Sequence, residues 1–142
     1  MLRLIAFSLD GEWYGLEVSH VRGIEPESQI SPVPRAPAWL LGVFNLHGTI
    51  LPAIDLRPLL GMADRKKNDA TLLLIFHWEG NLAALRVDSV DEMYELPRSS
   101  LEPQLATGSA DPTELLLGQV RVRDRVIGVI DPDRLVAALV EE

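Results

Sequence analysis

The sequence FSLDGEWYGLEVSHV, residues 7–21, decides the fold because its pattern returns 69 residues later as FHWEGNLAALRVDSV, residues 76–90. The two stretches align without a gap. Identical residues fall at five aligned positions, namely Phe7 with Phe76, Gly11 with Gly80, Leu16 with Leu85, Val18 with Val87 and Val21 with Val90. Self-similarity at a fixed spacing is typical of a duplicated structural unit.

A second pair of matching segments follows at a spacing of 76. Residues 40–42 (LLG) align with residues 116–118 (LLG), and residues 50–55 (ILPAID) align with residues 126–131 (VIGVID). The larger spacing implies an insertion in the second copy, and the polar, proline-bearing residues 97–114 can absorb it as a loop at little entropic cost. The sequence therefore predicts a duplication of a unit of roughly 65 to 70 residues.

Each copy has the pattern of a small β unit. An apolar segment, an acidic residue followed by glycine (Asp10-Gly11, Glu79-Gly80) and a second apolar segment predict a hairpin. Near the end of the chain, Val120 and Val122 alternate with polar residues, which predicts a strand with one buried face. Short strands with frequent turns favour small closed barrels, because closure removes exposed sheet edges.

The predicted fold class is mainly β: two tandem, pseudo-repeated, five-stranded β-barrel subdomains with short helices, forming a single domain over residues 1–142. We expect subdomain one at about residues 10–70 and subdomain two at about residues 71–142, with the strand at residues 2–9 able to join either one. Asp55 and Asp131 each precede a short helical segment that they can cap. The last helix is expected to place Leu135, Val136, Leu139 and Val140 on one apolar face.

Composition excludes several classes of function. The net charge of -8 repels phosphate backbones, and the only basic cluster, Arg65 to Lys67, is too short to outweigh it. There is no cysteine, hence no disulfide framework and no thiol nucleophile. The longest apolar run, residues 72–76, is far shorter than a membrane span. We expect a cytoplasmic protein without nucleic-acid binding and without direct membrane insertion.

A search for catalytic chemistry finds no site. The three histidines, His20, His47 and His77, lack metal-ligand spacing, and neither a metal nor another cofactor is implied. A duplicated β unit with an aspartate in each half suggests aspartic proteases, but Asp55 and Asp131 are followed by helix starts instead of the Thr-Gly or Ser-Gly turn of those enzymes. The alternative function is a duplicated β-barrel that binds a small ligand or hydrolyses one, which requires a concave pocket with paired polar groups of shifted pKa.

Residues 42–57 read GVFNLHGTILPAIDLR. This stretch resembles the signature of the CheW-like domain family, whose usual form is G-x-x-N-L-R-G-x-x-x-P-x-x-D-L-R, and supporting similarity covers residues 7–24, 85–90 and 127–135. The resemblance implies two SH3-like β subdomains and a stand-alone, non-enzymatic adaptor in bacterial chemosensory signalling. Its partners would be the regulatory domain of a CheA-type histidine kinase and the cytoplasmic tip of chemoreceptors. Through them it would sit at membrane-associated receptor arrays.

The resemblance also assigns residues to two binding surfaces. Around the receptor groove it places Val21, Gly42, Asn45, His47, Gly48, Val90 and Met93, and near the kinase surface it places Gly23 and Glu25. Structural roles compete with these assignments. Val21 and Val90 are repeat-equivalent and fit a core role in both units. Gly42 and Gly118 suggest a shared backbone demand. Asn45 and Gly48 fit an ordinary hairpin turn.

His47 is the main departure from the family signature, which usually has arginine at this position. Arginine is a planar, permanently charged donor of hydrogen bonds, whereas a histidine ring is mostly neutral at pH 7. A histidine can brace a groove more easily than it can hold a partner carboxylate. We therefore expect an unusual receptor or a divergent chemosensory array.

Overall fold

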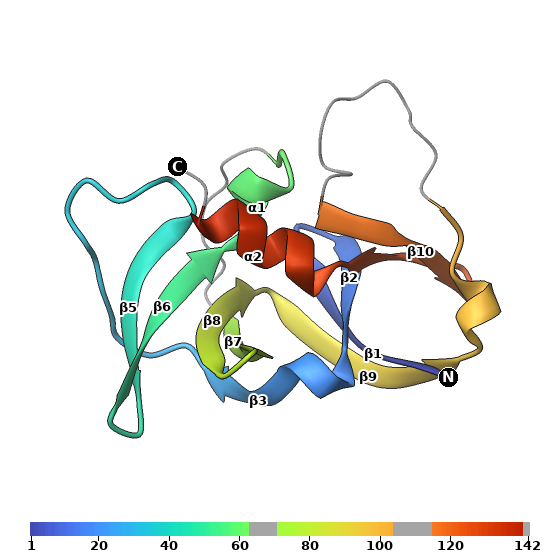
Figure 1. Cartoon of the computed structure of the whole chain (residues 1–142), viewed down its shortest axis with the longest axis horizontal. Helices are drawn as coiled ribbons and strands as arrows, with labels where there is room; N and C mark the ends of the chain where they lie inside the picture. Colours follow the sequence, from blue (N-terminus) through green and yellow to red (C-terminus); the bar gives the residue numbers. More distant parts are fainter. Residues whose placement is uncertain (63–70, 104–114, 141–142) are drawn as a thin grey trace.

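The computed structural model describes residues 1–62, 71–103 and 115–140, which form two β-sheets with few helices (Figure 1). The sheet that we call central has the order β3-β7-β8-β6-β5-β4. Its strands are β3 (Val21–Pro26), β4 (Ile30–Ser31), β5 (Leu40–Leu46), β6 (Thr49–Asp55), β7 (Leu72–Trp78) and β8 (Asn81–Val87). Most of the predicted loop insertion, and the basic cluster at residues 65–67, lie outside the described residues.

The second sheet, which we call terminal, is built from the two ends of the chain in the order β10-β11-β2-β1-β9. Its strands are β1 (Leu2–Leu9), β2 (Glu12–Glu17), β9 (Ser89–Leu96), β10 (Leu116–Val122) and β11 (Arg125–Ile130). The helices are short: 3-10 turns η1 (Val18–His20) and η2 (Arg98–Ser100), and α-helices α1 (Leu56–Leu59) and α2 (Pro132–Val140). The mainly β class with two SH3-like subdomains and short helices is confirmed.

The sequence duplication reappears as matching strand orders. With the spacings of 69 and 76 residues, β1, β2 and β9 correspond to β7, β8 and β3, and the pair β10, β11 corresponds to β5, β6. Both sheets then have the same order, apart from the extra edge strand β4. Both also contain one parallel pairing, β11 with β2 and β6 with β8, which joins the two hairpins of the sheet.

The expected division of the chain near residue 70 does not match the sheets. The central sheet takes its strands from residues 21–87, and the terminal sheet takes residues 2–17 together with residues 89–130. The first hairpin of each copy, β1–β2 or β7–β8, lies in the sheet formed by the rest of the other copy. This exchange arises because η1 leads the chain out of the terminal sheet after β2 and into the central sheet at β3. The strand at residues 2–9 lies in the terminal sheet, beside β2 and β9.

Two hairpin turns follow the predicted chemistry. Asp10 and Gly11 have φ values of 50° and 82°, and their repeat equivalents Glu79 and Gly80 have 45° and 83°. Two consecutive residues with positive φ characterise the tight turn that matches the natural twist of a hairpin, and glycine at the second position adopts it without steric penalty. The turn prediction is therefore confirmed in both copies.

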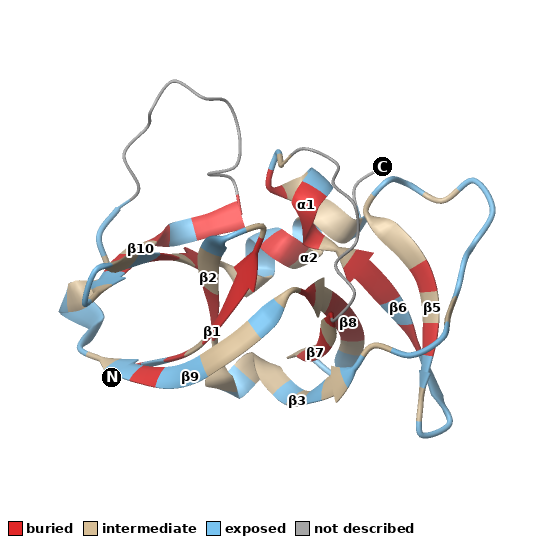
Figure 2. Cartoon of the chain, turned by 180° about the vertical axis from the view of Figure 1, so that it is seen from behind, coloured by how far each residue is buried: buried red, intermediate tan, exposed pale blue. Residues whose placement is uncertain are grey.

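The hydrophobic core joins the two sheets. Its largest cluster contains Phe7 and Leu16 of the terminal sheet, Phe76 and Leu85 of the central sheet, and Leu135 of α2. Figure 2 shows buried segments on strands of both sheets. Two smaller clusters lie within the individual sheets. Because burial of apolar surface is the main favourable term in folding, the shared cluster makes each sheet depend on the other.

The helices begin as expected. Asp55 accepts a hydrogen bond from the Arg57 amide at 3.1 Å, and Asp131 accepts one from the Asp133 amide at 2.9 Å. In α2, Leu135 is fully buried, whereas Val140 is 74% exposed, so only part of the predicted apolar face is covered. None of the helices in the described ranges has the length and apolar character that a membrane crossing needs.

Candidate protein interaction surfaces

Three of the expected receptor-binding residues form the turn between β5 and β6. Asn45 accepts a hydrogen bond through Oδ1 from the Gly48 amide at 2.8 Å, and φ is 50° at His47 and 92° at Gly48. Histidine tolerates positive φ better than most residues, and glycine adopts it freely. All three residues are exposed, and no hydrogen bond or ion pair within the described ranges occupies the His47 ring. The turn therefore leaves that ring exposed at the surface.

Strand β3 carries Val21 and both residues expected at the kinase surface. It lies at the edge of the central sheet, and Val21, Gly23 and Glu25 are half-buried along it. Between them Ile24 exposes 43% of its surface. A Cβ atom added at Gly23 would meet nothing within 4 Å, so this position has open space in front of it. An edge strand with an exposed apolar side chain is suited to pairing with another protein.

Strand β9 carries Val90 and Met93 at the edge of the terminal sheet. Val90 pairs with Phe7 and packs against the shared core cluster, as Val21 does. Both valines therefore have the core role that fits their repeat equivalence. Met93 is 48% exposed, and it is the repeat equivalent of Ile24. The two copies thus present a large apolar side chain at the same position of their edge strands.

Gly42 has a structural explanation. It is buried, its φ is 148°, and an added Cβ atom would lie 2.1 Å from the carbonyl oxygen of Ser31. At its repeat equivalent Gly118, a Cβ atom would lie 2.3 Å from the carbonyl oxygen of Glu102. Both glycines also sit at a register shift of their hairpins. The shared backbone demand inferred from the sequence accounts for both residues.

The expected receptor residues do not form one constellation. Val21 and Val90 each pack against the shared core cluster. The residues Asn45, His47 and Gly48 lie at the tip of the β5–β6 hairpin, and Gly42 is buried near the other end of that hairpin. No hydrogen bond or ion pair among the described residues links the turn to β3 or to β9. The outward-facing members of the set are the turn and Met93.

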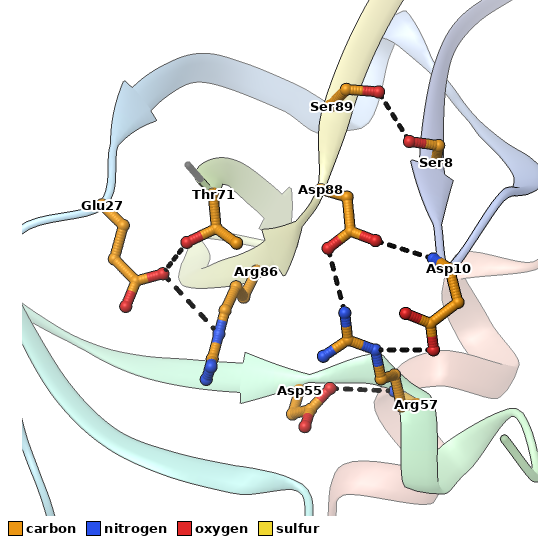
Figure 3. A network of polar contacts seen from close by, with 9 residues as sticks. All are labelled: Ser8, Asp10, Glu27, Asp55, Arg57, Thr71, Arg86, Asp88 and Ser89. Atoms are coloured by element: carbon orange, nitrogen blue, oxygen red, sulfur yellow. Dashed lines mark hydrogen bonds and ion pairs between the residues drawn. The ribbon is translucent and has the colours of Figure 1, made fainter. Parts of the chain in front are cut away.

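A buried ionic network lies where the two sheets meet, and our reasoning from the sequence did not predict it (Figure 3). Arg57, 5% exposed, places Nε 3.2 Å from Asp10 Oδ2 and donates from Nη2 to Asp88 Oδ1 at 2.9 Å. The Asp10 amide donates to Asp88 Oδ2 at 2.7 Å. Asp10 belongs to the β1–β2 turn, Arg57 to α1, and Asp88 to the link between β8 and β9.

This network fixes the relative positions of the sheets, since it joins the exchanged first hairpin to the central sheet. Ser8 and Ser89 add a hydroxyl-hydroxyl hydrogen bond of 2.6 Å nearby. The final arginine of the signature, Arg57, was the available signal. It lies two residues after a helix-capping aspartate in an apolar segment, and an arginine that is buried needs acidic partners. Its partners come from distant sequence positions, which a single sequence does not reveal.

A second polar cluster lies on the terminal sheet. The Arg125 guanidinium stands 3.8 Å from the centre of the Trp13 ring and pairs with Asp91, and the Tyr94 hydroxyl donates to Asp91 at 3.1 Å. The hydrogen bond from Arg125 lowers the pKa of Asp91, while burial and the Asp91 contact raise the pKa of Tyr94. An arginine stacked on tryptophan is a common element of binding surfaces. Trp13 is half-buried beneath the Arg125 guanidinium.

A metal centre was not expected, and the described residues contain no group of histidine, cysteine or acidic side chains that could hold an ion. Two pseudo-equivalent β subdomains that share a core and present exposed apolar edge strands together with an exposed turn define a class of protein that acts by binding other proteins. Comparisons with known proteins identify the family within that class.

The family model described as "CheW-like domain" matches residues 3–140, so the chain belongs to the CheW-like domain family. It is 28% identical to the chemotaxis protein CheW of Helicobacter pylori over 92% of this chain and 78% of the relative. It is 27% identical to CheW of Bacillus subtilis over 91% and 83% of the two chains. The solved structure of the scaffolding protein CheW from Thermoanaerobacter tengcongensis matches with a TM-score of 0.81 and 30% identity, over 92% of this chain and 84% of that chain.

These findings make the chain a non-enzymatic adaptor of chemotaxis signalling. This membership speaks against the hydrolase alternative. The lowered pKa of Asp91 comes mainly from its hydrogen bond with Arg125, and the raised pKa of Tyr94 comes mainly from burial.

Proposed function

We propose that this chain couples chemoreceptors to a CheA-type histidine kinase by binding the regulatory domain of the kinase and the cytoplasmic tip of the receptor. The observation that carries the proposal is the signature at residues 42–57, whose outward-facing part is the β5–β6 turn. The match of the family model over residues 3–140 supports treating residues 1–142 as a single CheW-like domain.

In this proposal the kinase domain docks on β3. The exposed side chain of Ile24 supplies apolar contact area, and Gly23 leaves room for a closely approaching backbone. The edge position of β3 leaves one side of the strand open to an added partner. Interfaces of this kind combine a small apolar centre with a polar rim, and the neighbouring Glu25 provides part of that rim.

The receptor tip, a helical segment, docks against the other exposed elements. Met93 on β9 offers a flexible apolar contact that adapts to different partner side chains. The β5–β6 turn adds the His47 ring, a weaker carboxylate partner than the arginine usual in the family. Coupling then follows from a shift in which assembly is populated, without any chemical step. The chain reaches the membrane-associated array only through these partners.

Calorimetry with the purified kinase regulatory domain and a receptor tip fragment from the same source tests the assignment. Gly23→Arg should weaken kinase binding at least tenfold and leave receptor binding unchanged, because the arginine fills open space in front of β3 without disturbing the fold. Met93→Glu should weaken receptor binding and leave kinase binding unchanged. His47→Arg should strengthen receptor binding.

Val126→Glu is the matched control, since Val126 is 46% exposed on β11, a strand that carries none of the assigned residues. If Gly23→Arg and Met93→Glu both bound the two partners as tightly as the wild-type protein does, the assigned surfaces would be contradicted. Failure of the folded wild-type protein to bind either partner would contradict the proposed function itself.

A further inference from the structure

An apolar hollow of about 310 Å³ lies between α2 and the central sheet. Phe76, Trp78 and Ala83 of β7 and β8 line it from the sheet, and Leu139 and Val140 line it from the helix. Figure 1 shows α2 at the centre of the molecule, where it lies above β7 and β8 in that view. None of the residues assigned to the receptor or the kinase lines this hollow.

The helical wall of the hollow is only partly covered by the protein. Leu135, earlier on α2, is fully buried, whereas Val140 in the wall exposes 74% of its surface. The wall on the sheet side is fixed in place, because the Trp78 indole Nε1 donates a hydrogen bond to Asp133 Oδ1 at 3.0 Å. A tryptophan held in one orientation beside an open apolar cavity favours binding, since little side-chain freedom remains to be lost.

The charges around the hollow are acidic. Asp133 contacts Trp78, and Glu79 occupies the exposed turn between the lining residues Trp78 and Asn81. No lysine or arginine is among the lining residues in the described ranges. The nearest arginine along α2, Arg134, instead pairs with Asp131 and donates to the Leu116 carbonyl at 2.9 Å. The rim therefore complements a positively charged partner.

The size and chemistry of the hollow indicate the kind of group that fills it. Its volume is at the lower end of the range of roughly 300–1,000 Å³ that is usual for small-molecule sites. Among the described lining residues only Asn81 and the Trp78 indole carry polar side-chain atoms, and the indole N–H already donates to Asp133, so a polar metabolite would find few partners there. A single large apolar side chain of a protein segment fits better, as in interfaces built on one anchor.

We propose that this hollow is a third docking site, which binds a partner segment through one large apolar side chain flanked by lysine or arginine. The site is separate from the surfaces on β3, on β9 and at the β5–β6 turn. It gives the adaptor a place for an additional protein while the other surfaces are occupied. The inference rests on the hollow between α2 and the central sheet and does not depend on the proposed function.

Selection from a displayed library of random 16-residue peptides against the full-length protein tests the proposal. The enriched peptides should share a leucine, methionine or aromatic residue next to lysine or arginine. Val140→Glu should weaken their binding about tenfold or more, because it places a charge in the apolar wall. Val126→Glu, which changes a 46% exposed valine of the terminal sheet, should bind them like the wild type. Glu79→Lys should weaken binding and reduce its dependence on salt.

Three results would overturn the proposal. One is enrichment of peptides whose binding is insensitive to Val140→Glu, and another is enrichment of anchors flanked by aspartate or glutamate. The third is self-association in sedimentation velocity that Val140→Glu abolishes, because the occupant would then be a second copy of this chain. Thermal melts of each variant by circular dichroism verify that a loss of binding does not reflect unfolding.

Discussion

Replacing Arg57 by methionine removes the positive charge that contacts both Asp10 and Asp88 in the network that joins the two sheets. The side chains of Arg57, Asp10 and Asp88 are 6%, 9% and 11% exposed, so the variant would take the guanidinium away from two largely buried carboxylates. Breaking a buried ion pair on one side typically destabilises a protein by about 3–5 kcal/mol. The unfolding entropy of a chain of this length is about 0.3 kcal/mol per kelvin at the midpoint, so Tm should fall by about 10–17 °C.

Urea unfolding and calorimetric melts of Arg57→Met measure this loss directly. Because the penalty comes from uncompensated charge, adding Asp10→Asn and Asp88→Asn to Arg57→Met should recover a large part of the lost stability. The surface pair Arg3 and Glu95 provides the control, since their side chains are 63% and 49% exposed and Arg3→Met should cost about 1 kcal/mol or less. A loss below about 1 kcal/mol for Arg57→Met, or no recovery in the triple variant, would refute the reasoning.

Three further predictions concern local features of the fold. Gly42→Ala should destabilise by about 2–4 kcal/mol in urea unfolding, because its Cβ atom would collide with the Ser31 carbonyl, whereas Gly23→Ala, with open space, should change stability by about 0.5 kcal/mol or less. Asp131→Ala should cost about 1 kcal/mol through loss of the α2 cap, and an unchanged Tm would speak against that role. Arg125→Gln should raise the pKa of Asp91 toward its ordinary value in a carboxyl NMR titration. Because the pKa of Asp91 is lowered in the folded state, the stability difference between wild type and Arg125→Gln should be full at neutral pH and shrink as pH falls through that pKa.

The duplication could be predicted because it depends on residue patterns that each strand and turn carry locally. Asp10-Gly11 and Glu79-Gly80 specify the same tight turn in both copies, and Gly42 and Gly118 meet the same backbone demand. The exchange of the first hairpins could not be predicted, because either arrangement pairs the same strands with equivalent neighbours. The three residues of η1 determine which arrangement forms, because they carry the chain from one sheet to the other.

The candidate sites also differ in whether local sequence is enough to predict them. The β5–β6 turn follows from Asn45, His47 and Gly48, whose local geometry is encoded in four consecutive positions. The buried network of Arg57 and the hollow beside Trp78 combine side chains from distant parts of the chain. Their members look ordinary in the sequence, because burial and charge pairing arise only when the two sheets pack together.

Sedimentation velocity of a three-component mixture tests the adaptor role most directly, with this chain, a CheA-type regulatory domain and a receptor tip fragment, each labelled with a different chromophore. Our account predicts a single boundary that contains all three labels, and a mixture without this chain should leave kinase domain and receptor fragment in separate boundaries. Boundaries that contain only pairs, with the receptor fragment and the kinase domain displacing each other from this chain, would contradict the claim that it binds both at once.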